Sequence, residues 1–315
     1  MKIQKYLLII CLFAVAACSS RLSNHAVIKS TVGTPVSSAK MIASMAHPGI
    51  LSFKKILSMQ QYSRRSEQII LDESAVDAGI VDADETIDIS FYAIRHPTKG
   101  LFLIDAGMPE NYLDYFGFIA KKFMSDVEIK MIQNTNHWIK EKAGMPLSGI
   151  FLTHLHFDHA MGVAATPINT PIYVGPNDGS QTDFGYRIAG GPDKALKGRA
   201  AMRELVFQKD AAGRFEGVLD IFGDGSLYAI LVPGHTPGSL AFLVNSTAGP
   251  KLITGDTVRT KLEWTHNLKP AWYVEGSEVA LSKSAALLRS FVVEHPEVEV
   301  HLGHQSLSTG ASLAP

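Results

Sequence analysis

The chain of 315 residues contains only two cysteines, 9% aromatic residues and no block of like charge. Two cysteines exclude a disulfide framework and a thiolate-rich metal site. The formal net charge of -1 gives no electrostatic reason to expect a nucleic-acid partner. With 46% hydrophobic residues, the chain is long enough to bury a large core. A disordered scaffold is therefore excluded as well.

The first seventeen residues have the pattern of an export signal. Lys2 and Lys5 precede an apolar run, residues 6–17, that is too short to span a bilayer comfortably. The stretch Val15-Ala16-Ala17-Cys18 resembles the lipobox of bacterial lipoproteins, in which the cysteine is lipidated and becomes the new N-terminus. We therefore expect an exported protein anchored through Cys18 to the outer membrane and facing the periplasm. An ordinary cleaved signal and an uncleaved anchor are the alternatives.

The next segment, residues 18–66, shows no clear periodicity. It is rich in small and polar residues up to about Lys40, and its apolar residues beyond that point are scattered. We expect a lipidated N-terminus and a tether, followed by an N-terminal extension with at most a short helix. Residues 67–315 are then expected to form one globular domain.

From Thr86 onward, short apolar strands alternate with helical segments. Ile87, Ile89 and Phe91 alternate with polar residues, which is the period of a half-buried strand. Further strands are predicted at 101–104, 150–152, 171–174, 227–232, 240–244, 251–254 and 298–302. Helices are predicted over most of 110–143 and around 281–292, with Ser277 capping the second. This order predicts an α/β sandwich.

Four polar residues follow the strand at 150–152: His154, His156, Asp158 and His159. Imidazole nitrogens and carboxylate oxygens are ligands that zinc prefers. His154 and His156 point the same way in an extended segment and can hold one ion, whereas the other two come after the turn and can reach a second. The pattern therefore indicates a dinuclear centre rather than a histidine-rich surface loop.

The stretch His154-x-His156-x-Asp158-His159 resembles the signature of the metallo-β-lactamase superfamily. Further matches follow in the family order, namely Gly234-His235-Thr236-Pro237-Gly238, Thr254-Gly255-Asp256-Thr257 and Gly303-His304, and the turn Asp105-Ala106-Gly107 also fits. The resemblance covers residues 87–305. It implies an α/β fold of the four-layer αβ/βα sandwich type and a hydrolase domain.

The resemblance also implies two Zn²⁺ per chain, with other divalent metals as alternatives. His154, His156 and His235 would hold the first ion. Asp158, His159 and His304 would hold the second, and Asp256 would bridge the two. Asp158 and Asp256 would also be the catalytic carboxylates, beside a bridging hydroxide that attacks the substrate. His301 competes with His304, but only His304 follows the end of the last strand, where the family delivers its ligands.

An aspartate at position 256 favours a lactonase over a true β-lactamase, which places cysteine or serine there. Three stretches resemble the N-acyl homoserine lactonases, namely 104–110, 152–162 and 169–172. This implies a small-molecule substrate, a lactone or related ester, and a homodimer as the assembly common among such relatives. Those lactonases have a tyrosine three residues after the bridging aspartate, where this chain has Arg259. Either Tyr186 or Tyr273 takes that role, or the substrate differs.

Substrate contacts are the least determined feature. Arg259, Trp272 and Tyr273 are candidates, and the pocket is expected to be lined by residues 111–145 and 178–216 together with Trp264. The aromatic residues either receive an acyl chain or belong to the core. The alternative functions are β-lactamase, thioesterase or phosphodiesterase. A non-catalytic zinc-binding lipoprotein is disfavoured, because all seven ligands of the family pattern are present.

Overall fold

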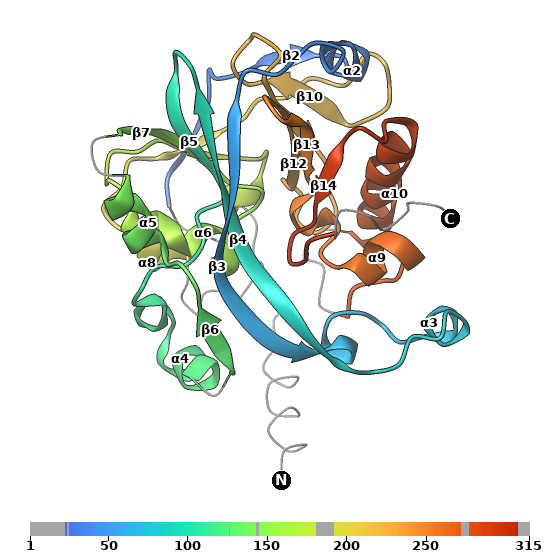
Figure 1. Cartoon of the computed structure of the whole chain (residues 1–315). Helices are drawn as coiled ribbons and strands as arrows, with labels where there is room; N and C mark the ends of the chain where they lie inside the picture. Colours follow the sequence, from blue (N-terminus) through green and yellow to red (C-terminus); the bar gives the residue numbers. More distant parts are fainter. Residues whose placement is uncertain are drawn as a thin grey trace.

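The computed structural model describes residues 23, 25–125, 127–142, 145–180, 192–271 and 277–307. Two β-sheets pack face to face, and helices cover their outer faces (Figure 1). The order of strands and helices predicted an α/β sandwich, and the family resemblance implied its four-layer αβ/βα form. The predicted fold class is confirmed.

The first sheet has eight strands. In spatial order they are β1 (Val27–Lys29), β9 (Met202–Glu204), β8 (Ile172–Val174), β7 (Leu147–Phe151), β5 (Gly100–Ile104), β4 (Asp84–His96), β3 (Ser52–Arg64) and β6 (Ile129–Met131). Pairing is parallel from β1 to β5 and antiparallel from β5 to β6.

The second sheet has six strands. They are β14 (Glu299–His301), β13 (Gly249–Ile253), β12 (Leu240–Ser246), β11 (Leu227–Leu231), β10 (Gly217–Asp220) and β2 (Thr34–Val36). Only the pair β13 and β14 is parallel. Because β12 is antiparallel to both of its neighbours, β11, β13 and β14 run in the same direction. Their carboxyl ends therefore meet at one edge of the sheet.

The helices form the two outer layers (Figure 1). One group covers the first sheet: α4 (Phe118–Ser125), α5 (Thr135–Glu141), α6 (Phe157–Ala160) and α8 (Pro192–Leu196). Two lie on the second sheet, α9 (Lys261–His266) and α10 (Glu278–Glu294), and α2 (Ser38–Ser44) and α3 (Glu73–Asp77) lie nearer the rim. The side chain of Ser277 accepts a hydrogen bond from the amide of Ala280, so it caps α10 as predicted.

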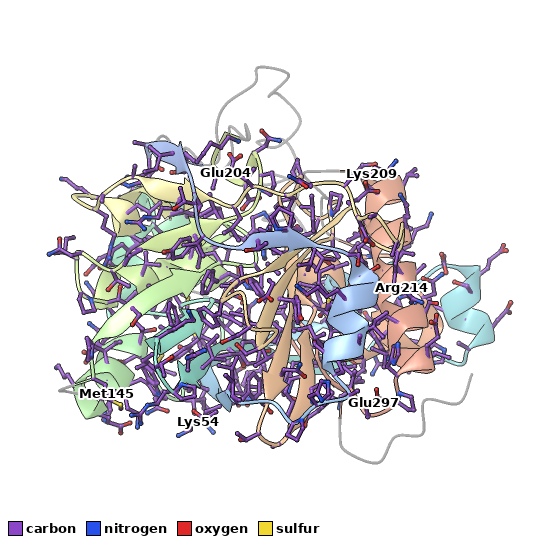
Figure 2. All side chains as sticks on the ribbon, turned by 90° about the horizontal axis from the view of Figure 1, so that it is seen from above. Lys54, Met145, Glu204, Lys209, Arg214 and Glu297 are labelled. Atoms are coloured by element: carbon purple, nitrogen blue, oxygen red, sulfur yellow. The ribbon has the colours of Figure 1, made fainter. Side chains whose placement is uncertain are left out.

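The core follows from the alternation of side chains along each strand. In β4, Phe91 and Ala93 face the helices, whereas Tyr92 and Ile94 face the other sheet. Apolar side chains on both faces explain why these strands read as nearly continuous hydrophobic runs. Figure 2 shows side chains filling the space between the sheets and Lys54, Met145 and Glu297 at the rim.

Two regions differ from the sequence-based expectation. The segment expected to be a tether and an extension contributes β1, β2, α2 and the thirteen-residue strand β3, so it belongs to the two sheets. The region 110–143, predicted to be mostly helical, contains a 3₁₀ turn, α4 and α5 but also the strand β6. Asn134 starts α5 afresh, because its side chain accepts a hydrogen bond from the amide of His137.

Within the described ranges, no helix is long and apolar enough to cross a membrane. The predicted signal of residues 1–17 and Cys18 lie outside the described residues.

Candidate active site

The first candidate ligands follow the buried end of β7. Asp105, which follows β5, accepts hydrogen bonds from the amide and the hydroxyl of Thr153 at 2.8 and 3.0 Å. Its other carboxylate oxygen lies 2.8 Å from Nδ1 of His159. This contact turns Nε2 of His159 toward the other ligands, in the way that outer carboxylates orient metal-binding histidines.

His235 is presented by a tight turn after β11. Gly234 has a φ of +147°, and a Cβ at this position would lie 2.2 Å from the backbone nitrogen of Leu281, so only glycine fits against α10. Ser239 closes the turn, because its hydroxyl oxygen accepts a hydrogen bond from the amide of Thr236 at 2.9 Å. Nε2 of His235 then lies 2.9 Å from Nδ1 of His156.

Asp256 and His304 come from the ends of β13 and β14. Nδ1 of His304 contacts the carbonyl of Asp88 at 3.0 Å, which leaves Nε2 at 3.2 Å from Oδ2 of Asp256. Gly303 is needed at this point, because a Cβ there would lie 2.5 Å from Oδ1 of Asp256. The parallel pairing of β13 and β14 therefore brings both side chains to the same place.

The seven residues form two adjoining groups. The ligand atoms of each group all lie within 4.8 Å of one another: His154, His156, His235 and Asp256 in one, and Asp158, His159 and His304 in the other. Asp256 connects them. Its Oδ1 lies 3.2 Å from Nε2 of His159, and its Oδ2 lies 3.5 Å from Nε2 of His235.

The donor atoms fit divalent cations. Among the described residues, three buried atoms of this cluster form no hydrogen bond: Nε2 of His154, Nε2 of His159 and Oδ1 of Asp256. A buried polar atom without a partner is costly, and several on one spot indicate a ligand that the protein chain does not supply. Five imidazoles and two carboxylates suit zinc or a similar metal.

Burial and the neighbouring charges shift the pKa values in opposite directions. Burial holds the pKa of His154 and of His235 well below the usual range of histidine. Burial also acts to lower the pKa of His159, but the carboxylates of Asp105 and Asp256 outweigh it and raise that pKa well above 6.5. For Asp256, burial acts to raise the pKa, yet His304 and His159 hold it well below 3.8. These neighbours favour the charged form of Asp256, which is the form in which a carboxylate binds metal.

His301, the alternative to His304, does not join the cluster. Its ring lies between the sheets, with ring centres 5.0 Å from Phe53 and 5.5 Å from Tyr92. Burial lowers its pKa to about 4. The structure therefore places His304, rather than His301, with the other six residues.

The residues predicted to contact the substrate lie in different places. Trp264 belongs to a buried core cluster that includes residues of α10, which is the core alternative given for the aromatic residues. Tyr186, Trp272 and Tyr273 lie outside the described residues. Arg259 is buried beside the cluster and forms an ion pair with Glu263 at 2.8 Å.

Sequence reasoning missed Glu263. Thr260 and Glu263 form a capping box at the start of α9, in which the hydroxyl of Thr260 accepts the amide of Glu263 and the carboxylate of Glu263 accepts the amide of Thr260. The pattern Thr-x-x-Glu is the signal that could have revealed it. Asp88 was also missed, because its contact to His304 uses the backbone carbonyl and leaves no signal in the residue type.

Comparison with known proteins decides the family. A family model described as the metallo-β-lactamase superfamily matches residues 86–304, which is more than half of the chain. The chain belongs to the metallo-β-lactamase superfamily. Its membership and its clustered histidines and aspartates make it a metal-dependent hydrolase.

Relatives within this superfamily include lactonases. The chain is 30% identical over 236 residues to an N-acyl homoserine lactonase from Bacillus sp, an alignment that covers 73% of this chain and 87% of the relative. A solved N-acyl homoserine lactone hydrolase with the product N-hexanoyl-L-homoserine bound at its catalytic metal centre has a TM-score of 0.51 at 20% identity, covering 79% and 93% of the two chains. A dizinc quorum-quenching lactonase has a TM-score of 0.53 at 14% identity, covering 82% and 88%. At these identities the two structures support the fold of this metallo-β-lactamase member.

Proposed function

We propose that the protein is a lactonase that hydrolyses N-acyl homoserine lactones or similar lactones and esters with two zinc ions per chain. The observation that carries the proposal is the pair of adjoining ligand groups connected by Asp256. The kinship with the Bacillus lactonase over most of both chains supports the substrate class.

Some residues of the site would hold the metals, and others orient those ligands. His154, His156 and His235 would hold one ion, Asp158, His159 and His304 the other, and Asp256 both. Two such cations would polarise the substrate carbonyl and activate a water for attack. Asp105 holds His159 in the required orientation, and the carbonyl of Asp88 does the same for His304.

The two carboxylates of the cluster have unequal access to a substrate. The side chain of Asp158 is 16% exposed, whereas that of Asp256 is 5% exposed. We assign Asp158 the transfer of a proton from the attacking water to the leaving oxygen, since it is the carboxylate that a bound substrate reaches more easily. Asp256 stays between the two ligand groups and provides their common carboxylate.

The test is hydrolysis by the zinc-loaded full chain, followed as acid release at constant pH. Short- and long-chain acyl homoserine lactones are compared with esters, thioesters, phosphodiesters and β-lactams. The proposal predicts that lactones have the highest kcat/KM and that activity disappears with chelator and returns with zinc. A higher kcat/KM for any of the other four classes would overturn the lactonase assignment and leave the metal-dependent hydrolase in place.

A further inference from the structure

A small cavity adjoins the ligand cluster on the side of α9 and α10. Its volume is about 80 Å³, and its lining includes His235, Asp256, Thr257, Arg259 and Leu281. Two of the candidate metal ligands therefore face the same space as an arginine and a threonine. A cavity of this kind suits a compact polar group of a substrate rather than a long acyl chain.

The guanidinium of Arg259 is held along one side only. Nε and Nη2 donate to Oε1 of Glu263 at 3.2 and 2.8 Å, and Nη2 also donates to the carbonyl of Gln68 at 2.7 Å. The backbone is fixed as well, because the carbonyl of Arg259 accepts the amide of His304 at 2.9 Å. Arg259 is thereby tied to a candidate metal ligand and has little freedom to turn.

The third guanidinium nitrogen has no such partner. Among the described residues, nothing accepts a hydrogen bond from Nη1 of Arg259, although the residue is only 6% exposed. The hydroxyl of Thr257 in the same lining is likewise buried without a hydrogen bond among those residues. An open donor on a side chain that its other hydrogen bonds hold rigid, in a cavity beside the candidate metal ligands, is what a pre-organised contact to a substrate oxygen requires.

We propose that Arg259 contacts the substrate, its Nη1 donating a hydrogen bond to an oxygen of the scissile ester group, with Glu263 and Gln68 as positioning residues. This inference rests on the proposed function for the identity of the substrate. Arginine remains charged at all working pH values, so the donor is always available. Its charge is offset by Glu263, which allows the cavity to accept a neutral lactone as well as the developing negative charge of the reaction.

The test compares Arg259→Met and Arg259→Lys with the wild-type full chain, all loaded with zinc. Loss of the donor in Arg259→Met is expected to lower kcat/KM for a lactone about 100-fold, with the zinc content unchanged. Arg259→Lys keeps the positive charge but lacks the planar guanidinium with its several donors, so we expect kcat/KM to fall about tenfold. Arg214→Met is the matched control, because Arg214 pairs with Glu294 on the surface and should leave kcat/KM unchanged.

A binding measurement separates this inference from the proposed function. N-hexanoyl-L-homoserine, the ring-opened product of a lactone, is titrated into each zinc-loaded variant, and binding at least tenfold weaker in Arg259→Met than in wild type is expected. If the wild type did not hydrolyse lactones but still bound the product in a way that depends on Arg259, the proposed lactonase function would be overturned and the contact of Arg259 would stand. The contact would be overturned if Arg259→Met had the same lactone turnover and the same product binding as wild type. It would also be overturned if loss of zinc from Arg259→Met accounted for the whole decrease in kcat/KM.

Discussion

Oδ2 of Asp105 lies 2.8 Å from Nδ1 of His159, and this contact aims the opposite ring nitrogen at Asp256. Asp105 has a φ of +56°, a conformation that asparagine also tolerates. We therefore expect Asp105→Asn to fold but to bind zinc at the group of His159 about 10–100-fold more weakly. Zinc content after dialysis against a graded chelator measures this.

Asp224→Asn is the control for that experiment. Asp224 contacts Nε2 of His96 at 2.7 Å, but His96 lies at the opposite end of the antiparallel pair β4 and β5 from Asp105. This variant should keep its zinc. Equal zinc loss in both variants would show that the effect of Asp105 is a general loss of packing.

The second prediction concerns Gly303. A Cβ at this position would lie 2.5 Å from Oδ1 of Asp256, so Gly303→Ala should displace the carboxylate that connects the two ligand groups. We expect a folded protein with fewer than two zinc ions per chain and little turnover. Gly79→Ala is the matched control: its positive φ costs stability, but it has open space around it and should not affect zinc. A fully zinc-loaded, active Gly303→Ala would contradict this geometry.

Metal removal should lower thermal stability. Without metal, three buried atoms of the cluster form no hydrogen bond with the described residues: Nε2 of His154, Nε2 of His159 and Oδ1 of Asp256. If free zinc is about a hundred times Kd, binding adds about 2.7 kcal/mol, which corresponds to an increase in Tm of roughly 4 °C for a chain of 315 residues. Calorimetry with and without chelator measures the difference, and an identical Tm would show that no metal binds the folded state.

The seven candidate metal ligands are the part of the site whose clustering follows most directly from the sequence. Each follows a short apolar strand, and a buried strand end fixes where the next few side chains point. The hydrogen bond of Arg259 to Gln68 could not be foreseen, since Gln68 is 191 positions away in the chain. The ion pair with Glu263, four residues on, was overlooked although the capping-box pattern marks that residue. The three-residue strands β1 and β2 were missed for a related reason: they are too short to show a period, and only pairing with β9 and β10 makes them strands.

Asp210 provides a prediction about pH. Hydrogen bonds from the amide and hydroxyl of Ser38 at 2.9 and 2.6 Å, with others from the amides of Ala212 and Phe215, lower its pKa from 3.8 to about 2 although burial acts to raise it. Because the folded-state pKa is depressed, the stabilisation is complete above the unfolded pKa and is lost as pH falls through about 2.

Asp210→Asn should therefore lower the free energy of unfolding by about 1–3 kcal/mol at neutral pH. The difference from wild type should shrink as pH drops from about 4 toward about 2. Urea unfolding at several pH values measures it, and a difference that stays constant down to pH 2 would assign the effect to packing instead.

The lipid anchor is a prediction about residues 1–18. Cys18→Ser should abolish incorporation of labelled fatty acid and release the protein from the membrane fraction, because the serine lacks the thiol that is acylated. Cys11→Ser is the control, since Cys11 lies inside the predicted signal and should have no effect. Unchanged labelling in Cys18→Ser would refute lipidation at this residue.

The most direct measurement of the central claim is a zinc titration of the metal-free full chain with lactone turnover recorded in the same samples. The account predicts that turnover rises to a plateau at two zinc ions per chain, and that Asp256→Ala, which lacks the connecting carboxylate, binds fewer ions and is inactive. A plateau at one ion, or near-normal turnover in Asp256→Ala, would contradict the dinuclear lactonase.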